Sequence, residues 1–389
     1  MSKLLEQINT SERKIYHIKD MGRIVTGKTP SKDNPEDWGN ELDFITPTDF
    51  SSTNKYLSNI KRKISQEGIL RYKNMILPSE SVVVTCIGSD MGKVIVSKNR
   101  ALTNQQINSI VVNKESFNLE FVYYVLKSLY PTLRSIAEEG GSTMPIITKS
   151  VFEQIEFKAP DLPTQNKIAE ILSAYDSKIE NNNKIIKNLE LTAQSIFNEW
   201  FVNFKFPGYE KVKMVDGDMG EIPEGWKVEN VMDVIDRIPV GKKYDNKSAL
   251  PNGKVPILDQ GASGFIGYHN EEAGIKASLD NPVVVFTNHT CYYRLLTEPF
   301  SCIQNVLPYI GKNGYSTLFI YFLTKEKIKM SEYKGHWPEF EQQISPIPPI
   351  ELANAFASKI QGFIKESVLL EKENIKLKES RDQLLAKLI

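Results

Sequence analysis

Gly22, Gly27, Lys28 and Thr29 have the spacing of a phosphate-binding loop, in which two glycines precede a lysine and a threonine. In such a loop the phosphates bind to the lysine and to the free N–H groups at the start of a helix. Here Pro30 follows at once, and a residue that precedes proline is disfavoured in a helix. The sequence therefore argues against a nucleotide site, and a nucleotide-hydrolysing enzyme stays a minor alternative.

Histidine and cysteine, the side chains that most often serve as bases, nucleophiles and zinc ligands, are few and scattered. No two histidines stand four residues apart, and the cysteines form no Cys-x-x-Cys pair. Neither pattern offers a metal cluster or a nucleophile beside a base. We therefore predict no catalytic residue, no metal and no cofactor. These residues are His17, His269, His289, His336, Cys86, Cys291 and Cys302.

Composition is that of a folded protein of two domains. The 389 residues include 48 basic and 48 acidic side chains, so the formal net charge is zero. The chain as a whole therefore lacks the positive charge that is typical of many nucleic-acid-binding proteins. Unpaired cysteines fit a reducing compartment. The sequence starts without the apolar core of a signal peptide, and no apolar run is long enough to span a membrane. We expect a cytoplasmic protein.

A long internal repeat organises the chain. FEQIEFKAPDLPTQNKIA at 152–169 is echoed by FEQQISPIPPIELANAFA at 340–357, so that Pro160 and Pro348 lie 188 positions apart. SVVVT at 81–85 likewise parallels PVVVF at 282–286. A repeat of this length predicts two copies of one structural plan, each a globular unit followed by a linker.

Both linkers have the seven-residue periodicity of supercoiled helices, with apolar residues spaced alternately by four and three. The phase is the same in both copies, which favours a paired coiled coil over two unrelated surface helices. The predicted seam comprises Ile168, Leu172, Tyr175, Ile179, Asn182, Ile186, Leu189, Ala193, Ile196 and Trp200 in the first helix, and Phe356, Ile360, Phe363, Ser367, Leu370, Asn374, Leu377, Arg381, Leu384 and Leu388 in the second.

The globular units have the pattern of mixed α+β domains. Runs of β-branched residues predict strands at 82–87, 94–96, 107–112 and 283–286, and 119–128 has a helical pattern. We predict an α+β protein with two tandem α/β-type domains, separated and followed by long antiparallel coiled-coil helices, as a pseudo-two-fold internal repeat. The expected boundaries are 1–160, 161–204, 205–347 and 348–389.

Several segments resemble the DNA specificity subunits of type I restriction-modification systems, in the order in which that family has them. The resemblance covers nearly the whole chain, but the second copy departs more, since Ala353 stands where Gln165 stands in the first. The segments are GKTPSKDNPEDWGNELDFITPTDF at 27–50, LTNQQINSI at 102–110, GSTMPIITKSVFEQIEF at 141–157, LPTQNKIAEIL at 162–172, NEWFVNFKFPG at 198–208 and GEIPEGW at 220–226.

The resemblance implies a non-catalytic subunit that recognises a split target in double-stranded DNA. Residues 1–160 and 205–347 would be target recognition domains, each for one half of the target. The helices would form a spacer that binds two methyltransferase subunits, and motor-nuclease subunits would join for cleavage. The rival interpretation is a coiled-coil scaffold that does not read DNA.

Polar loop residues are the expected DNA contacts, with lysines and hydroxyls suited to phosphates and Gln or Arg suited to base edges. Each of these residues is also compatible with a solvated loop. In the first copy they are Lys28, Thr29, Ser31, Lys32, Arg100, Gln105, Gln106, Ser142 and Thr143. In the second copy they are Lys242, Lys243, Tyr244, Gln260, Asn288, His289, Arg294, Gln304 and Lys334.

Two-fold symmetry also predicts the register of the spacer. An antiparallel pair that uses the full seam sets Ile168 against Leu388 and Trp200 against Phe356, with Asn182 facing Asn374. A polar residue in a seam costs stability but fixes alignment. Roughly 33 residues at about 1.5 Å each give a rod of about 50 Å, or about 15 base pairs. The spacer would thus set the gap between the two half-targets.

Overall fold

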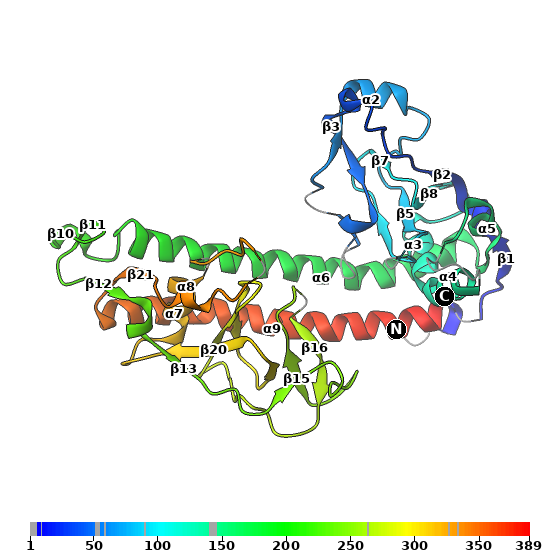
Figure 1. The fold of residues 1–389 in the computed structure, drawn as a ribbon. Coiled ribbons are helices and arrows are strands. Elements are labelled where there is room, and N and C mark those ends of the chain that lie inside the picture. Colours follow the sequence, from blue (N-terminus) through cyan, green and yellow to red (C-terminus); the bar gives the residue numbers. More distant parts are fainter. Residues whose placement is uncertain are drawn as a thin grey trace. The chain divides into compact units, whose positions relative to one another are not determined.

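The computed structural model describes residues 6–8, 10–50, 55–57, 60–88, 91–139, 146–262, 264–325, 327–332 and 334–389. The chain divides into two compact units, which we call the first unit (1–181 with 374–389) and the second unit (182–373). The division passes through both long helices, drawn green and orange to red in Figure 1. Each unit is therefore built from a globular part and a section of each long helix.

The first unit is centred on an antiparallel sheet of order β2-β8-β5-β6. All four residues of β5 are buried. Val82 and Val84 pack into the core that includes the helices, whereas Val83 packs into a smaller core on the opposite face. A strand covered on both faces is a continuous apolar run, which is why Val82–Thr85 lacks alternation. The strands are β2 (Gly22–Thr26), β5 (Val82–Thr85), β6 (Val94–Val96) and β8 (Ile107–Val112).

A second sheet of order β4-β3-β7, in which β3 and β7 are parallel, and an antiparallel pair β1-β9 complete the strands of the first unit. Their bounds are β1 (Lys14–His17), β3 (Trp38–Ile45), β4 (Lys63–Ile64), β7 (Ala101–Thr103) and β9 (Glu156–Ala159). The helices are η1 (Ile18–Met21), η2 (Pro35–Asp37), η3 (Pro47–Asp49), α2 (Gln66–Arg71), α3 (Leu119–Ser128), α4 (Tyr130–Glu139) and α5 (Lys149–Gln154).

The second unit repeats this plan. Its antiparallel sheet has the order β13-β20-β17-β18, its other main sheet has parallel β15 and β19, and β12 pairs with β21. The strands are β10 (Met214–Gly217), β11 (Gly220–Pro223), β12 (Lys227–Asn230), β13 (Ile235–Arg237), β14 (Lys243–Tyr244), β15 (Val255–Leu258), β16 (Phe265–His269), β17 (Val283–Thr287), β18 (Tyr293–Leu296), β19 (Ser301–Ile303), β20 (Val306–Gly311) and β21 (Ile344–Ile347). The helices are η4 (Asn198–Val202), η5 (Tyr209–Lys211), η6 (Val231–Asp233), α7 (Thr317–Thr324) and α8 (Trp337–Phe340).

The internal repeat is therefore present in the topology. Strand order β2-β8-β5-β6 corresponds to β13-β20-β17-β18, the parallel pair β3/β7 corresponds to β15/β19, and β1-β9 corresponds to β12-β21. The buried helices α3 and α7 each follow the last strand of the antiparallel sheet. The predicted α+β class with a repeated domain is confirmed.

Two long helices, α6 (Leu162–Phe197) and α9 (Ile350–Leu388), form the spacer. In the first unit the start of α6, with Ile168, packs in one core with the end of α9, with Leu388. In the second unit the Trp200 ring, just beyond α6, lies 6.1 Å from the Phe356 ring near the start of α9. Within each unit the two helices are thus antiparallel. Every predicted seam residue is buried or half-buried.

The end of α9 is also held by the start of the globular part of the first unit. Arg13 donates hydrogen bonds from Nη1 to the carbonyl of Ile389, at 2.9 Å, and from Nη2 to the carbonyl of Leu388, at 2.7 Å. A cation that caps the free carbonyls at a helix end is favoured there. Residues 374–389 therefore complete the first unit.

Candidate nucleic-acid interface

In the first unit, the loop after β2 lies against the turn between β7 and β8. Lys28 donates its backbone N–H to the Thr103 carbonyl at 2.8 Å. Gly27 allows this approach, because a Cβ there would stand 2.1 Å from the same carbonyl oxygen. The side chains of Thr29 and Gln105, which are 76 residues apart in the sequence, form a hydrogen bond of 2.7 Å between the two segments. Two of the predicted contact loops thus meet at one end of the sheet.

The amide of Gln105 is held in one orientation by Thr29. Its Oε1 atom accepts hydrogen bonds from the Thr29 hydroxyl at 2.7 Å and from the Thr29 backbone N–H at 3.2 Å. Both lone pairs of that oxygen are then used. The hydrogen-bonding groups that this exposed side chain still offers are the two N–H donors of Nε2. Gln105 therefore presents donors and no acceptor to a ligand.

The remaining predicted residues of the first copy are spread around these loops. Gln106 accepts a hydrogen bond from Asn104 at 3.1 Å, and Ser31 donates to Asp33 at 3.1 Å. Lys28 and Lys32 are exposed. Exposed Arg100 precedes β7, whereas Gln105 follows it, so they flank opposite ends of that strand. Ser142 and Thr143 lie outside the described residues.

In the second unit, the predicted contacts gather around a cleft of about 780 Å³. The cleft lies where β14, the loop after β15, the loop after β17 and the β19–β20 turn converge. Six of the predicted residues line it: Lys242, Lys243, Tyr244, Gln260, His289 and Gln304. Here too a glutamine is oriented from behind, since Gln260 Oε1 accepts the backbone N–H of His289 at 3.0 Å.

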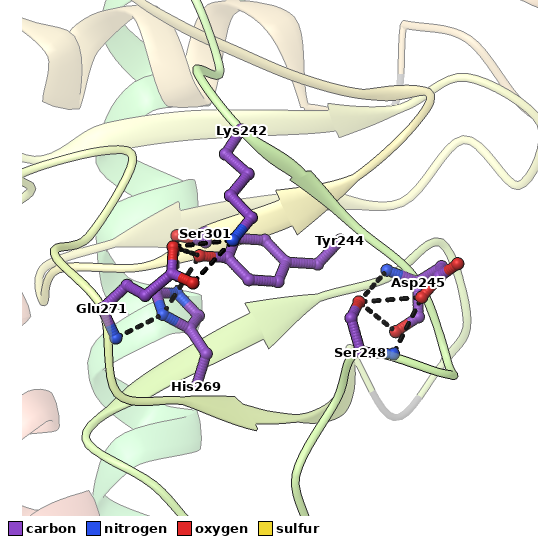
Figure 2. Close-up of polar contacts among 7 residues, drawn as sticks. All are labelled: Lys242, Tyr244, Asp245, Ser248, His269, Glu271 and Ser301. Carbon is purple, nitrogen blue, oxygen red and sulfur yellow. Dashed lines mark hydrogen bonds and ion pairs between the residues drawn. The ribbon is translucent and has the colours of Figure 1, made fainter.

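One wall of the cleft is fixed by a polar network, which we call the Tyr244 network (Lys242, Tyr244, His269, Glu271 and Ser301; Figure 2). The Tyr244 ring stacks on the buried His269 ring, with centroids 4.2 Å apart, and its hydroxyl donates to Glu271 at 3.1 Å. His269 Nε2 lies 2.9 Å from the Ser301 hydroxyl. Glu271 also accepts from Lys242 at 2.6 Å.

Electrostatics in this network favour a neutral histidine. Burial lowers the pKa of His269, and the hydrogen bonds from Lys242 and Tyr244 lower the pKa of Glu271. His269 Nδ1 accepts the backbone N–H of Glu271 at 3.1 Å, so the ring proton belongs on Nε2 and points to Ser301. A general base would need a free Nε2 to take the serine proton. This pair is therefore arranged for packing and not for nucleophilic catalysis.

The other predicted contacts of the second copy have partners inside their own unit. Asn288 accepts the backbone N–H of Trp337 at 2.8 Å. Arg294 donates to the Gly261 carbonyl at 2.5 Å and lies over the Tyr292 ring. Lys334 pairs with Glu332 and Glu339, each at 2.8 Å. Asn288 and Arg294 thus hold the loops that line the cleft.

No sequence pattern points to the residues that support the cleft from behind. His269 belongs to no metal-ligand or nucleophile–base pattern, and no motif contains Glu271 or Ser301. Asn305, which also lines the cleft, adopts the left-handed conformation with φ 66° and closes the β19–β20 turn. Asparagine tolerates this conformation better than most residues, so an Asn between two apolar runs was the available signal.

The phosphate-loop pattern has no phosphate-loop structure. After β2, residues 27–34 run as a loop, and the next helix is the three-residue η2. Among the described residues no group of His, Cys, Asp or Glu could hold a metal ion, and none of their helices is long and apolar enough to cross a membrane. The three cysteines are buried and unpaired.

Comparison with known proteins gives a consistent result. Residues 10–191 match the family described as type I restriction modification DNA specificity domain. The MjaIX specificity subunit of a Methanocaldococcus jannaschii type I restriction enzyme is 28% identical over 96% of this chain and 92% of that protein. The HindI specificity subunit of Haemophilus influenzae is 30% identical over 46% of this chain and 40% of that protein.

A solved structure has a similar fold. The S subunit of a type I restriction-modification system from M. genitalium superposes with a TM-score of 0.56, at 15% sequence identity, over 98% of this chain and 97% of that one. This similarity extends over both units and the long helices.

Proposed function

Because this chain belongs to the DNA specificity subunits of type I restriction-modification systems, we propose that each of its two globular domains reads one half of a bipartite DNA target through the loops described above. The observation that carries this proposal is the oriented glutamine in each copy. Gln105 is held by Thr29 and Gln260 by His289. Each domain thus has a loop glutamine whose side-chain oxygen accepts a backbone N–H, and each of these glutamines lies among other polar loop residues.

Hydrogen-bond chemistry narrows what Gln105 can read. With its oxygen engaged by Thr29, the amide presents only donors, which fit acceptors such as N7 and O6 of guanine or a phosphate oxygen. A bidentate contact between a glutamine amide and adenine needs an acceptor on the amide as well as a donor. This orientation does not supply one. Lys28 and Lys32, in the same loop as Thr29, are exposed and suit phosphates, which set register without reading sequence.

We propose further that the antiparallel spacer binds two methyltransferase subunits and that motor-nuclease subunits join that assembly, in the cytoplasm. The support is the exposed polar face that the long helices keep outside their seam. The chain itself would contribute no catalytic residue. That part rests on the tautomer of His269, the buried Ser301 hydroxyl and the absence of a helix after Thr29.

The test is selection of DNA from a random pool by the complex of this chain with co-expressed methyltransferase subunits. Gln105→Glu keeps the acceptor for Thr29 but replaces the outward donors with a carboxylate. We expect it to lower discrimination in one half of the selected target by about 1–3 kcal/mol. Gln260→Glu should do the same in the other half only.

Gln154→Glu on α5 and Gln342→Glu after α8 are the matched controls, because they add the same charge outside these loops. They should leave the selected target unchanged. Equal effects of all four substitutions would mean that the loops do not read bases, which would favour the rival scaffold. Nucleotide turnover that disappears in Lys28→Ala would overturn the non-catalytic assignment.

A further inference from the structure

A buried ionic cluster joins the two long helices in the first unit. Asp176 on α6 forms an ion pair with Arg381 on α9 and accepts the Tyr124 hydroxyl of α3 at 2.6 Å. The Asp176 and Arg381 side chains are only 11% and 8% exposed. Arg381 also contacts its neighbour Asp382 at 2.8 Å. Burial and the Asp176 carboxylate raise the pKa of Tyr124, so the phenol stays a donor.

The internal repeat supplies an apolar counterpart for each member of this cluster. Ile364 stands 188 positions after Asp176, Ala193 stands 188 positions before Arg381, and Phe322 corresponds to Tyr124. All three belong to the main core of the second unit, with Ala193 fully buried and Ile364 packed at its margin. The same architecture is therefore built once with a buried ion pair and once without it.

A second polar pair follows the same rule. In the second unit Asn182 on α6 donates to the Glu373 carboxylate on α9 at 2.8 Å. The corresponding residues in the repeat are Leu370 and Ile185, both apolar. Each polar pair thus joins one residue of α6 to one residue of α9, and neither has a polar counterpart.

These placements decide which helices can pair. The seams of α6 and α9 share one phase, so two copies of this chain could pair α6 with α6 and α9 with α9. In an α6–α6 pair Asp176 would face Ala193, and in an α9–α9 pair Arg381 would face Ile364. Asp176 would then be buried without a cation, and Arg381 would keep only its neighbour Asp382. A buried charge that has lost its partner is far more costly than an intact pair or a pair replaced by apolar residues.

We propose that the Asp176–Arg381 pair, together with Asn182–Glu373, is a pairing code that directs α6 to α9 and excludes association with a second copy of this chain through like helices. The code need not add stability, because apolar residues occupy the corresponding places in the core of the second unit. Its effect is a difference between alternatives. This proposal is independent of which DNA the domains read.

The test uses the full chain with a reporter cysteine, Ile185→Cys. In an α6–α6 pair this position lies within one helical turn of the two-fold axis, so the two copies come close enough to crosslink, whereas the native cysteines are buried. Tyr124→Phe, Asp176→Ile and Arg381→Ala together copy the apolar counterpart. After refolding at increasing protein concentration, we expect the disulfide-linked dimer of this triple variant to exceed that of Ile185→Cys alone by at least about ten-fold.

Exchange of the charges, Asp176→Arg with Arg381→Asp, keeps the rule that α6 pairs with α9, so this variant should give no more dimer than Ile185→Cys alone. Asn182→Leu with Glu373→Ile should raise the dimer fraction by a smaller factor, and it covers the case in which the triple variant fails to fold. Folded apolar variants that stay monomeric without the crosslink would overturn the proposal. So would crosslinking of the charge-exchanged variant at the level of the triple variant.

Discussion

His269 and His336 are both buried in the second unit, but their surroundings favour opposite protonation states. His269 Nδ1 accepts a backbone N–H, and burial lowers its pKa. His336 has acceptors at both ring nitrogens, the Glu339 carboxylate at 3.0 Å and the Glu332 carbonyl at 3.0 Å. The hydrogen bond to Glu339 raises the pKa of His336, which suits a doubly protonated ring. The neighbours of each ring therefore fix its charge.

These shifts predict opposite pH dependences of stability. A lowered pKa in the folded state stabilises above the unfolded value of about 6.5, and that contribution is lost as the pH falls. A raised pKa stabilises below about 6.5, and that contribution is lost as the pH rises through the folded pKa. Between about pH 5 and pH 8, we expect His269→Gln to reduce the acid-side loss of the free energy of unfolding and His336→Gln to reduce the alkaline-side loss.

Urea unfolding of each variant across this range measures both slopes. Tyr244→Phe is the control for His269→Gln, because it weakens the same network without removing a group that titrates in this range. Parallel curves for the wild type and both histidine variants would mean that neither ring changes its protonation on unfolding.

At the scale of elements, each long helix caps a buried helix of its globular domain. Gln165 on α6 accepts the Asn118 backbone N–H at the start of α3 at 3.0 Å and donates to the Pro160 carbonyl at 3.0 Å. In the second copy Ala353 replaces this glutamine. Asn354 takes over, accepting the Ser316 N–H at the start of α7 at 2.9 Å and donating to Gly314 at 3.0 Å. The departure in sequence is compensated by the next residue.

Removal of these caps should destabilise one unit at a time. Gln165→Ala leaves a part-buried N–H without its acceptor, and we expect it to cost the first unit about 1–3 kcal/mol. Asn354→Ala should cost the second unit a similar amount. Asn166→Ala removes only an exposed bond to Asn118 and is the matched control. Hydrogen exchange of the α3 and α7 amides would locate each effect, and loss of protection in both units from one substitution would contradict it.

The spacer is the second element with a testable consequence. Four residues inserted near Asn182 lengthen a helix by about 6 Å, so we expect the preferred gap between half-targets to grow by at most about two base pairs. Methylation by the assembled complex of DNAs that differ only in gap length measures this. An unchanged optimum would show that the helices do not set the spacing.

At the scale of the molecule, sequence periodicity predicted the architecture better than the site. The seam from Ile168 to Trp200 was predictable because each heptad repeats the same requirement for burial. The strand at 82–87 was predictable because β-branched residues favour strands, although β5 ends at Thr85. The pairing of Thr29 with Gln105, or of Tyr244 with His269 and Ser301, depends on loops that meet only after folding. No local pattern specifies such contacts.

Two copies of one domain plan also predict modular specificity. Exchange of residues 1–155 for the equivalent domain of another specificity subunit should change one half of the selected target and leave the other half intact, because the loops of each copy are held by contacts within their own unit. DNA selection by the exchanged complex measures this. A change in both halves would mean that the two domains do not read independently.

The contribution of residues 374–389 to the first unit has a consequence for biosynthesis. Ile168 and Leu172 belong to the same core as Leu385 and Leu388, which the ribosome adds about 200 residues later. At about 5–20 residues per second, this apolar strip of α6 stays without its native neighbours for roughly 10–40 seconds. The second unit, made from the continuous segment 182–373, can finish folding during that interval. The globular domain that is translated first is therefore completed last. During translation its uncovered apolar strip on α6 is available to chaperones and to aggregation.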